Sequence, residues 1–276
     1  MLNLMYITNK PAVAKIAEEA GVDWIFIDME FIGKDSRQGG LDTVQNHHTV
    51  EDVKIIRKSI TKAELLVRVN PIHEALGNYP SSKDEIDTTI AAGADILMLP
   101  FFKTVEEVKT FIKLVDGRAK TLLLMETVEA ANLIDEILEV PGIDMIHLGL
   151  NDMHLELGMK FMFQLLADGT VDKLGNKIKG KGIPFGFGGI ATLDGGALPG
   201  SMVLKEHVRL GSSMVIVSRS FCNTDVISDL GEVKELFQKG IKEIRDLETD
   251  LKDRPSDYFE KNRLEVINAV QKIVNQ

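Results

Sequence analysis

The feature that most constrains the fold is an eightfold alternation of short apolar runs with segments of helical periodicity. The runs are residues 4–7, 25–28, 65–69, 96–99, 122–126, 145–148, 183–185 and 214–217. Several of them contain no alternating polar residues, as expected for parallel strands that are buried on both faces. Eight strands joined by helices fit a closed barrel better than an open sheet. The pattern therefore predicts an α/β protein with the (β/α)8 architecture of a TIM barrel.

The chain length is consistent with one domain. A domain usually takes roughly 150 residues, but a single α/β barrel takes about 250, and this chain has 276. We therefore assign residues 1–276 to one barrel domain, with an additional C-terminal helix in residues 256–276. That helix follows the eighth strand–helix unit and carries Phe259, Val266 and Val270 on one side. Its partner is either its own barrel or another subunit, and the sequence pattern leaves both alternatives open.

Composition excludes several classes of function. The formal net charge is −10, and Lys and Arg form no stripe of the kind that neutralises nucleic-acid phosphates. No apolar run approaches the roughly 20 residues of a transmembrane helix. The single cysteine, Cys222, cannot form an internal disulfide, and the first residues lack the basic flank and long apolar run of a signal peptide. We therefore expect a cytoplasmic protein without nucleic-acid or membrane partners.

Two connections are longer than the usual loops between a strand and the following helix. One spans residues 30–49 after the second strand, and the other is the glycine-rich segment 182–200 around the seventh strand. In barrels of this kind the loops that follow the strands carry the active site. We therefore expect both segments to contribute to function.

Two carboxylates lie at the ends of neighbouring predicted strands. Glu126 closes the fifth strand, and Asp152 follows the sixth. Because neighbouring parallel strands place their carboxyl ends side by side, both side chains can reach one ion. Paired carboxylates without a nearby cysteine suit a hard divalent cation such as Mg2+ or Mn2+. The alternative is structural, with each residue capping the helix that follows it.

Three further features point to an anionic ligand. Arg68 ends the third strand, where a buried guanidinium needs a carboxylate or phosphate partner. It either binds a substrate or forms a salt bridge with Glu30 or Glu126. Arg219 follows the eighth strand, where it can bind the anionic end of a substrate. A short helix begins after Gly149, Leu150 and Asn151, whose backbone N–H groups can bind a carboxylate.

Five segments carry a resemblance to a known family. They are residues 22–30, 65–68, 93–100, 125–127 and 141–152. Taken together and in this order, they resemble the HpcH/HpaI aldolase and citrate lyase β-subunit family over roughly residues 20–160. The resemblance implies a (β/α)8 barrel related to the phosphoenolpyruvate mutase and isocitrate lyase barrels. It also implies a homo-oligomer in which the C-terminal helix, residues 256–276 here, packs on or swaps with a neighbouring subunit.

The resemblance also assigns roles to the candidate residues. Aldolases of the family bind pyruvate through a divalent metal and stabilise its enolate, which implies metal ligation by Glu126 and Asp152. The expected metal is Mg2+, with Mn2+ or Co2+ as alternatives. Arg68 matches the family arginine that contacts the substrate oxygen. The backbone of residues 149–151 matches the segment before the metal-binding aspartate.

The chain departs from the family pattern at two positions. Aldolases of the family have a Glu-His pair after the second strand, where this chain has Glu30 and Phe31. Phenylalanine cannot transfer a proton. Leu124 also replaces a glutamine that lies two residues before the metal-binding glutamate.

The long loop after the second strand offers substitutes for the missing histidine. His47 and His48 can each supply a catalytic imidazole, and Lys34 and Arg37 can bind an anionic substrate. The alternative is that the two histidines only precede Thr49 as the cap of the next helix.

These observations predict a carbon–carbon lyase of the aldolase type that cleaves or forms a 2-oxo acid through a metal-bound enolate. In this hypothesis Arg68 stabilises the oxyanion, Asp28 or Glu30 organises a metal-bound water, and His48 supplies the imidazole. The substrate is a small anion, pyruvate or another 2-oxo acid. There are two alternatives: a citrate-lyase-like enzyme that cleaves an acyl-thioester, and a barrel that binds a metabolite without turnover, because Phe31 replaces the catalytic histidine.

Overall fold

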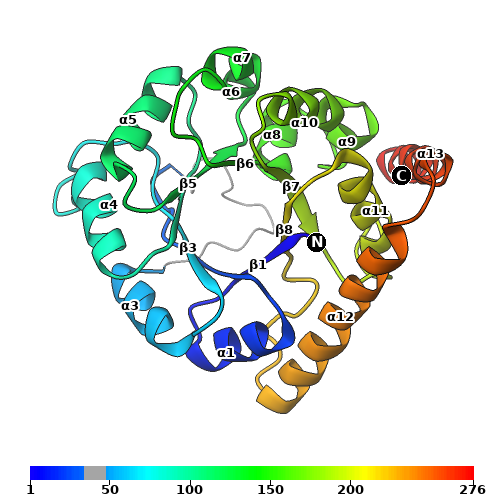
Figure 1. Cartoon of the computed structure of the whole chain (residues 1–276), viewed down its shortest axis with the longest axis horizontal. Helices are drawn as coiled ribbons and strands as arrows, with labels where there is room; N and C mark the ends of the chain where they lie inside the picture. The colour runs from blue at the N-terminus through cyan, green and yellow to red at the C-terminus, as the bar shows by residue number, and fades with distance from the viewer. Residues whose placement is uncertain (34–47) are drawn as a thin grey trace.

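The computed structural model describes residues 1–33 and 48–276, and eight parallel strands form a closed barrel at its centre (Figure 1). The strands are β1 (Asn3–Ile7), β2 (Trp24–Asp28), β3 (Glu64–Arg68), β4 (Ile96–Leu99), β5 (Lys120–Met125), β6 (Met145–Leu148), β7 (Phe185–Ile190) and β8 (Met214–Val217). Each strand pairs with the next one in the chain, and β8 pairs with β1 to close the barrel. The predicted TIM barrel is confirmed.

Helices surround the barrel as an outer ring in Figure 1. They are α1 (Pro11–Ala20), α3 (Val50–Ser59), α4 (Ser82–Ala91), α5 (Val105–Val115), α6 (Val128–Asn132), α7 (Ile134–Ile137), α8 (Leu150–Glu156), α9 (Gln164–Ala167), α10 (Thr170–Gly180), α11 (Gly200–Leu210), α12 (Leu230–Leu251) and α13 (Ser256–Val274). Thr49 and Thr104 are the N-cap residues of α3 and α5, and each forms a capping box with the acidic residue three positions later.

The barrel interior is a packed apolar core. It is filled by side chains from alternate positions of the strands: Met5, Trp24, Phe26, Leu66, Ile96, Met98, Leu122, Leu124, Met145 and Met214. The intervening strand residues join a second apolar layer beneath the helices. Because the interior is filled, a ligand can be accommodated only at an end of the barrel.

The prediction for the seventh strand was wrong. The sequence pattern predicts a strand at residues 183–185, whereas β7 runs from Phe185 to Ile190 and includes three glycines of the segment predicted to form a long connection. Glycine is rare in strands, but a close approach requires it here. A Cβ on Gly186 would lie 2.3 Å from the carbonyl oxygen of Met214 and 2.8 Å from Nδ1 of His147. The absence of a side chain lets β7 and β8 meet at this point.

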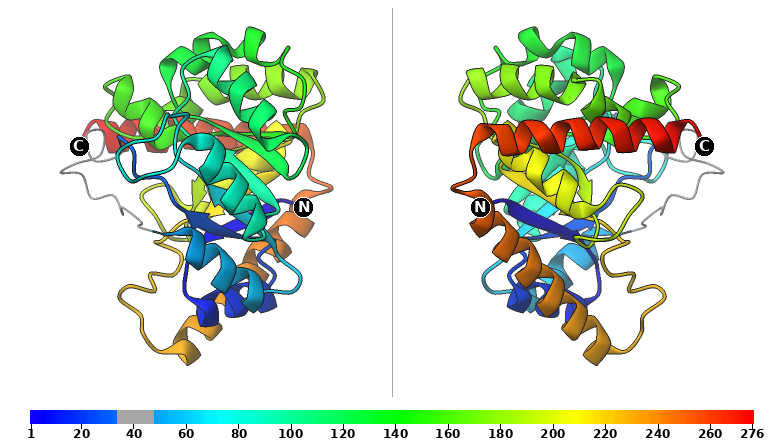
Figure 2. Two further views of the ribbon diagram at one scale, coloured as in Figure 1. Left: turned by 90° about the vertical axis from the view of Figure 1, so that its left-hand side faces the viewer. Right: turned by 90° about the vertical axis from the view of Figure 1, so that its right-hand side faces the viewer.

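The last helix lies against its own barrel. α13 contacts α11 and α9 (Figure 2), and it buries Phe259, Val266 and Val270. One of the two alternative partners is therefore seen within the chain, and a contact of this helix with a neighbouring subunit stays a prediction. None of the helices in the two described ranges is long and apolar enough to cross a membrane.

Candidate active site

A cavity of about 360 Å3 lies at the carboxyl-terminal end of the barrel strands, and we call it the mouth cavity. Its wall contains most of the residues that the sequence nominated: His48, Arg68, Glu126, Gly149, Leu150, Asn151, Asp152 and Arg219. The fold thus brings together positions from five separate strand–helix connections. Lys34, Arg37 and His47 lie outside the described residues, so their predicted roles stay predictions.

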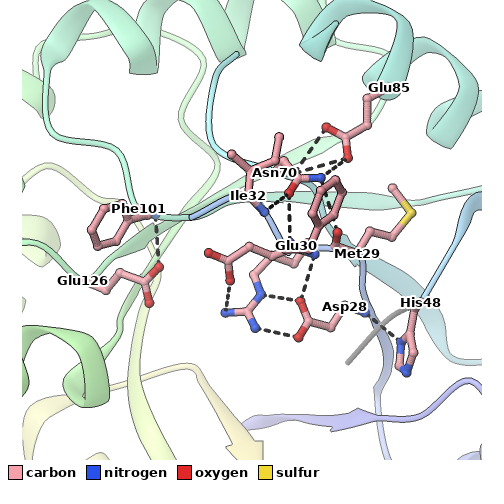
Figure 3. Close-up of polar contacts among 11 residues, drawn as sticks. Asp28, Met29, Glu30, Ile32, His48, Asn70, Glu85, Phe101 and Glu126 are labelled. Carbon is pink, nitrogen blue, oxygen red and sulfur yellow. Dashed lines mark hydrogen bonds and ion pairs between the residues drawn. The ribbon is translucent and has the colours of Figure 1, made fainter. Parts of the chain in front are cut away.

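Arg68 is held by two carboxylates, Asp28 and Glu30, which are labelled in Figure 3. Its Nε and Nη2 donate to Oδ1 and Oδ2 of Asp28 at 2.7 and 2.8 Å, and Nη1 lies 3.3 Å from Oε2 of Glu30. Both carboxylates are buried, and only 15% of the Arg68 side chain is exposed. Burial acts to lower the pKa of Arg68, but the charges of Asp28 and then Glu30 outweigh it and hold this pKa well above its ordinary value. The guanidinium is therefore a permanent, oriented cation.

Strand register explains the closer of these two contacts. Asp28 and Arg68 are the last residues of β2 and β3, and they are direct partners in the sheet. The predicted salt bridge with Glu30 is confirmed, but Asp28 was not proposed as a partner of Arg68. The available signal was that both residues end strands that are neighbours in the barrel.

A buried network around Asn70 fixes the chain that follows β2. Oδ1 of Asn70 accepts hydrogen bonds from the N–H groups of Phe31 and Ile32, both at 2.9 Å. Its Nδ2 donates to Glu85 at 2.8 Å, and the Tyr79 hydroxyl donates to the same carboxylate oxygen at 2.8 Å. Asn70 and Glu85 are each 1% exposed. Asn70 was not proposed from the sequence, because an asparagine that binds backbone groups leaves no pattern there.

Glu126 lies just after β5 and is fixed by backbone on two sides. Its Oε1 accepts a hydrogen bond from the N–H of Phe101 at 3.0 Å, as Figure 3 shows. Phe101 has a φ of 46°, a left-handed conformation that is uncommon outside glycine. On the other side, a Cβ on Gly149 would lie 2.6 Å from Cβ and 2.9 Å from Oε2 of Glu126. The glycine therefore makes room for this carboxylate.

Asp152 supplies the second carboxylate of the mouth cavity. It lies in the first turn of α8, its side chain is buried, and Asn151 donates to its Oδ1 at 3.4 Å. Two oxygen-donor carboxylates in one cavity fit a hard divalent cation. In the two described ranges, no group of three or more His, Cys, Asp or Glu side chains is arranged to hold a metal. A cation bound by Glu126 and Asp152 would therefore take its remaining ligands from water and substrate.

The backbone amides before Asp152 are not equivalent. The N–H of Gly149 donates to the carbonyl oxygen of Met125 at 2.9 Å, so it belongs to the contact between β5 and β6. The amides of Leu150 and Asn151 lie in the first turn of α8. At that place a helix has no carbonyl of its own to accept from its N–H groups.

His48 combines the two roles that the sequence left open. Its neighbour Thr49 caps α3, with the Thr49 N–H donating to Asp52 at 2.7 Å. The imidazole itself lines the mouth cavity, and its Nδ1 accepts a hydrogen bond from the N–H of Asp28 at 3.0 Å. His48 therefore lines the same cavity as Arg68 and also directly precedes the N-cap residue of α3.

Two further cationic side chains line the mouth cavity. Arg219 follows β8 and is exposed, and it makes no ion pair or hydrogen bond with any of the described residues. Lys10 follows β1 on the same wall and was not proposed from the sequence. Its Nζ lies 3.1 Å from Oδ1 of Asp225, so its charge is already matched. Arg219 is the cation with more capacity for an anionic ligand.

Comparison with known proteins identifies the family. The model of the HpcH/HpaI aldolase/citrate lyase family matches residues 3–162, a range that contains Glu30, Arg68, Glu126 and Asp152. The chain belongs to this family. The crystal structure of an HpcH/HpaI aldolase/citrate lyase family protein from Burkholderia cenocepacia J2315 has a TM-score of 0.62 and 16% identity, over 84% of this chain and 94% of that one. The structure of citrate synthase SbnG has a TM-score of 0.60 and 16% identity, over 84% and 92%. Among curated proteins no match was found.

The departure of this HpcH/HpaI family member from the aldolase pattern has a structural counterpart. Phe31 does not line the mouth cavity. Its ring packs edge-on against Tyr79 at 4.7 Å between centroids and lines a second cavity of about 370 Å3 together with Met29, Val50 and Pro80. The residue that follows Glu30 therefore faces away from Arg68, whereas His48, at the other end of the loop, lines the mouth cavity.

Proposed function

We propose that this family member is a divalent-metal-dependent carbon–carbon lyase that cleaves or forms a 2-oxo acid through an enolate. The observation that carries the proposal is the presence of Glu126, Asp152 and Arg68 in one cavity at the barrel mouth. Two carboxylates supply oxygen ligands for a metal, and a permanent cation lies on the same wall. This combination suits a substrate that develops negative charge on oxygen.

Glu126 and Asp152 would hold the cation, Mg2+ first and Mn2+ or Co2+ as alternatives. A divalent cation there supplies Lewis-acid polarisation of the keto group. The contribution of the chain is to fix the two ligands. Glu126 is held by the Phe101 amide and by the close backbone of Gly149, so little reorganisation is needed when the ion binds.

Arg68 would stabilise the oxygen on which charge accumulates. A guanidinium has five N–H donors in a planar fork. Asp28 accepts hydrogen bonds from two of these donors, at Nε and Nη2, and the Glu30 carboxylate lies close to the third nitrogen, Nη1. The carboxylates therefore orient the fork while leaving donor capacity for a substrate oxygen. Glu30 and Asp28 would also organise a water molecule beside the substrate.

The rest of the wall suits a small anion. The amides of Leu150 and Asn151 would donate to the carboxylate of the 2-oxo acid, and Arg219 would bind an anionic group at the far end of the substrate. In keeping with the family, we propose that the protein is a cytoplasmic homo-oligomer whose α13 contributes to the subunit interface.

Exchange of the pyruvate methyl protons with deuterated solvent tests the proposal. Enolisation requires the metal ligands and Arg68 but no acceptor aldehyde, so the unknown acceptor does not matter. We expect exchange that depends on Mg2+, Mn2+ or Co2+ and is lost in Glu126→Gln. The matched control is Glu129→Gln, because Glu129 is an exposed residue of α6 that pairs with Lys103. If pyruvate binds but its protons do not exchange with Mg2+, Mn2+ or Co2+ present, the result would contradict the lyase proposal. It would support a barrel that binds a metabolite without turnover.

A further inference from the structure

The loop between β4 and α5 contacts the end of β5 through two hydrogen bonds of opposite direction. The N–H of Phe101 donates to Oε1 of Glu126 at 3.0 Å, as Figure 3 shows. One residue further on in each segment, the hydroxyl of Thr127 donates to the carbonyl oxygen of Phe102 at 2.8 Å. Two consecutive residues of the loop are thus bound to two consecutive residues after β5. We call this pair of hydrogen bonds the loop clamp.

The hydroxyl of Thr127 is buried and serves two neighbours. Thr127 is 0% exposed, and Phe102 is 1% exposed. The same hydroxyl oxygen accepts a hydrogen bond from the N–H of Ala130 at 3.2 Å, because Thr127 is the N-cap residue of α6. A hydroxyl has one proton to donate and two lone pairs to accept with, so the cap leaves the proton for Phe102. Thr127 therefore connects the loop after β4 to the first turn of α6.

Phe101 lies between two fixed points of the chain. On one side β4 ends at Leu99, and Pro100 follows with a φ that its ring restricts. On the other side Phe102 is held by its buried ring and by the clamp. The φ of Phe101 is 46°, a conformation that persists outside glycine only where the surrounding structure imposes it. Because both neighbours are fixed, this φ sets the direction of the Phe101 N–H.

We infer that Thr127 is a positioning residue for Glu126: by holding Phe102, its hydroxyl keeps Phe101 in the left-handed conformation that directs the Phe101 N–H at the carboxylate. The inference rests on the proposed function, in which Glu126 binds the metal. Without the hydroxyl, the buried carbonyl of Phe102 loses its partner and the strain at Phe101 can relax. The N–H would then turn away from Oε1, and the carboxylate would lose a group that orients it.

Hydrogen exchange of the Phe101 amide, followed by NMR on the metal-free protein, tests the clamp itself. Thr127→Val keeps the shape of the side chain but removes the hydroxyl, so we expect exchange that is faster by about tenfold, the value of one hydrogen bond. Thr127→Ser keeps the hydroxyl and should exchange at close to the wild-type rate. Ser81→Ala removes the N-cap hydroxyl of α4 and controls for the loss of a cap. Wild-type exchange in Thr127→Val, or the same acceleration in Ser81→Ala, would overturn the inference.

Titration with Mn2+ measures the consequence for the metal ligand. Loss of a group that orients a ligand lowers metal affinity about 10–100-fold, and we expect this loss in Thr127→Val and close to wild-type affinity in Thr127→Ser. Unchanged affinity in Thr127→Val would overturn the positioning role. If the wild-type protein binds no Mn2+, the proposed function fails, whereas the exchange experiment still decides the clamp. The two proposals can therefore fail separately.

Two substitutions of Phe101 test its backbone conformation without a change at Thr127. Phe101→Val and Phe101→Gly both remove the ring, but only glycine adopts a positive φ without strain. We expect weaker Mn2+ binding in Phe101→Val than in Phe101→Gly. Asp116, with a φ of 50°, is the other non-glycine residue of positive φ in the two described ranges. Asp116→Val should therefore lower the unfolding temperature and leave the affinity unchanged. Equal affinities in the two Phe101 variants would overturn the role of the left-handed backbone.

Discussion

The carboxylate of Asp28 and the guanidinium of Arg68 form a two-point ion pair in which Nε and Nη2 donate to the two carboxylate oxygens at 2.7 and 2.8 Å. The pair lies at the carboxyl ends of the adjacent strands β2 and β3, and both residues line the mouth cavity. Asp28 is completely buried. It therefore matters to the stability of the barrel as well as to the orientation of Arg68.

Replacement of Asp28 by Asn should destabilise the protein markedly. The change leaves a buried guanidinium with one carboxylate partner, and removal of one member of a buried ion pair costs about 3 kcal/mol or more. Urea unfolding measures this loss. Asp246→Asn is the matched control, because Asp246 pairs with Lys242 on the exposed face of α12 and such substitutions stay within about 0.5 kcal/mol. Equal unfolding free energies for the two variants would contradict the importance of the Asp28 pair.

The sequence predicted the barrel well because each strand and helix leaves a local pattern. Seven of the eight predicted strands overlap the observed strands over most of their length, and the error at β7 has a specific cause. Glycine is required at position 186 because its partners on the two neighbouring strands, His147 and Met214, approach it closely. Such a contact between residues distant in the chain is invisible in a local run of sequence.

The candidate site was predicted less completely for a related reason. Glu126, Asp152 and Arg68 stand out as charged residues at the ends of apolar strands, so the pattern alone nominates them. Asp28 ends a strand in the same way, but its contact with Arg68 depends on the register of two strands. Asn70 accepts hydrogen bonds from backbone amides some 40 positions earlier in the chain. Because nearly every residue has a backbone amide, the sequence does not indicate which amides this asparagine binds.

A methyl group at Gly149 should weaken metal binding. The Cβ of Gly149→Ala would lie 2.9 Å from Oε2 and 2.6 Å from Cβ of Glu126, so the carboxylate must move. Disturbance of the groups that orient metal ligands lowers affinity about 10–100-fold. Titration with Mn2+, followed by electron paramagnetic resonance, measures the affinity. Gly180→Ala is the control, because a Cβ on Gly180 meets no atom within 4 Å. Wild-type affinity in Gly149→Ala would argue against Glu126 as a ligand.

Removal of the Arg219 charge should raise the KM for anionic substrates more than the KM for uncharged ones. The guanidinium has no partner among the described residues and lines the mouth cavity, so it can bind an anionic group of the acceptor. Arg219→Gln should raise the KM for an aldehyde with a terminal carboxylate by about tenfold, the value of one hydrogen bond to a charged group. The KM for the matching aldehyde with a terminal methyl group should change much less.

The selectivity in this experiment identifies the role of Arg219. Lys234→Gln removes a positive charge from α12 and controls for the general field of the protein. A similar rise of KM for both aldehydes, or the same selectivity in Lys234→Gln, would mean that Arg219 does not contact the acceptor.

Buried histidines should make the protein less stable as the pH falls below about 6.5. His147 in β6 is fully buried, its Nε2 lies 3.0 Å from the carbonyl oxygen of Gly188, and burial lowers its pKa from 6.5 to about 4. His207, which stacks on Phe187, also has a pKa lowered by burial. Between pH 6.5 and 4 the unfolded chain binds protons at these rings that the folded protein does not bind. Stability is therefore lost as the pH falls through this window.

The variant His147→Gln isolates the contribution of one imidazole ring to this pH dependence of stability. Each proton bound only by the unfolded chain contributes about 1.4 kcal/mol per pH unit to the slope of the unfolding free energy. The Gln amide can still donate to the carbonyl oxygen of Gly188 but does not titrate. Urea unfolding from pH 7 to pH 4.5 should therefore show a slope that is shallower by about one proton in the variant, with His207 accounting for a remaining part. An unchanged slope would mean that His147 can be protonated in the folded barrel, and hence that water reaches the ring from the mouth cavity.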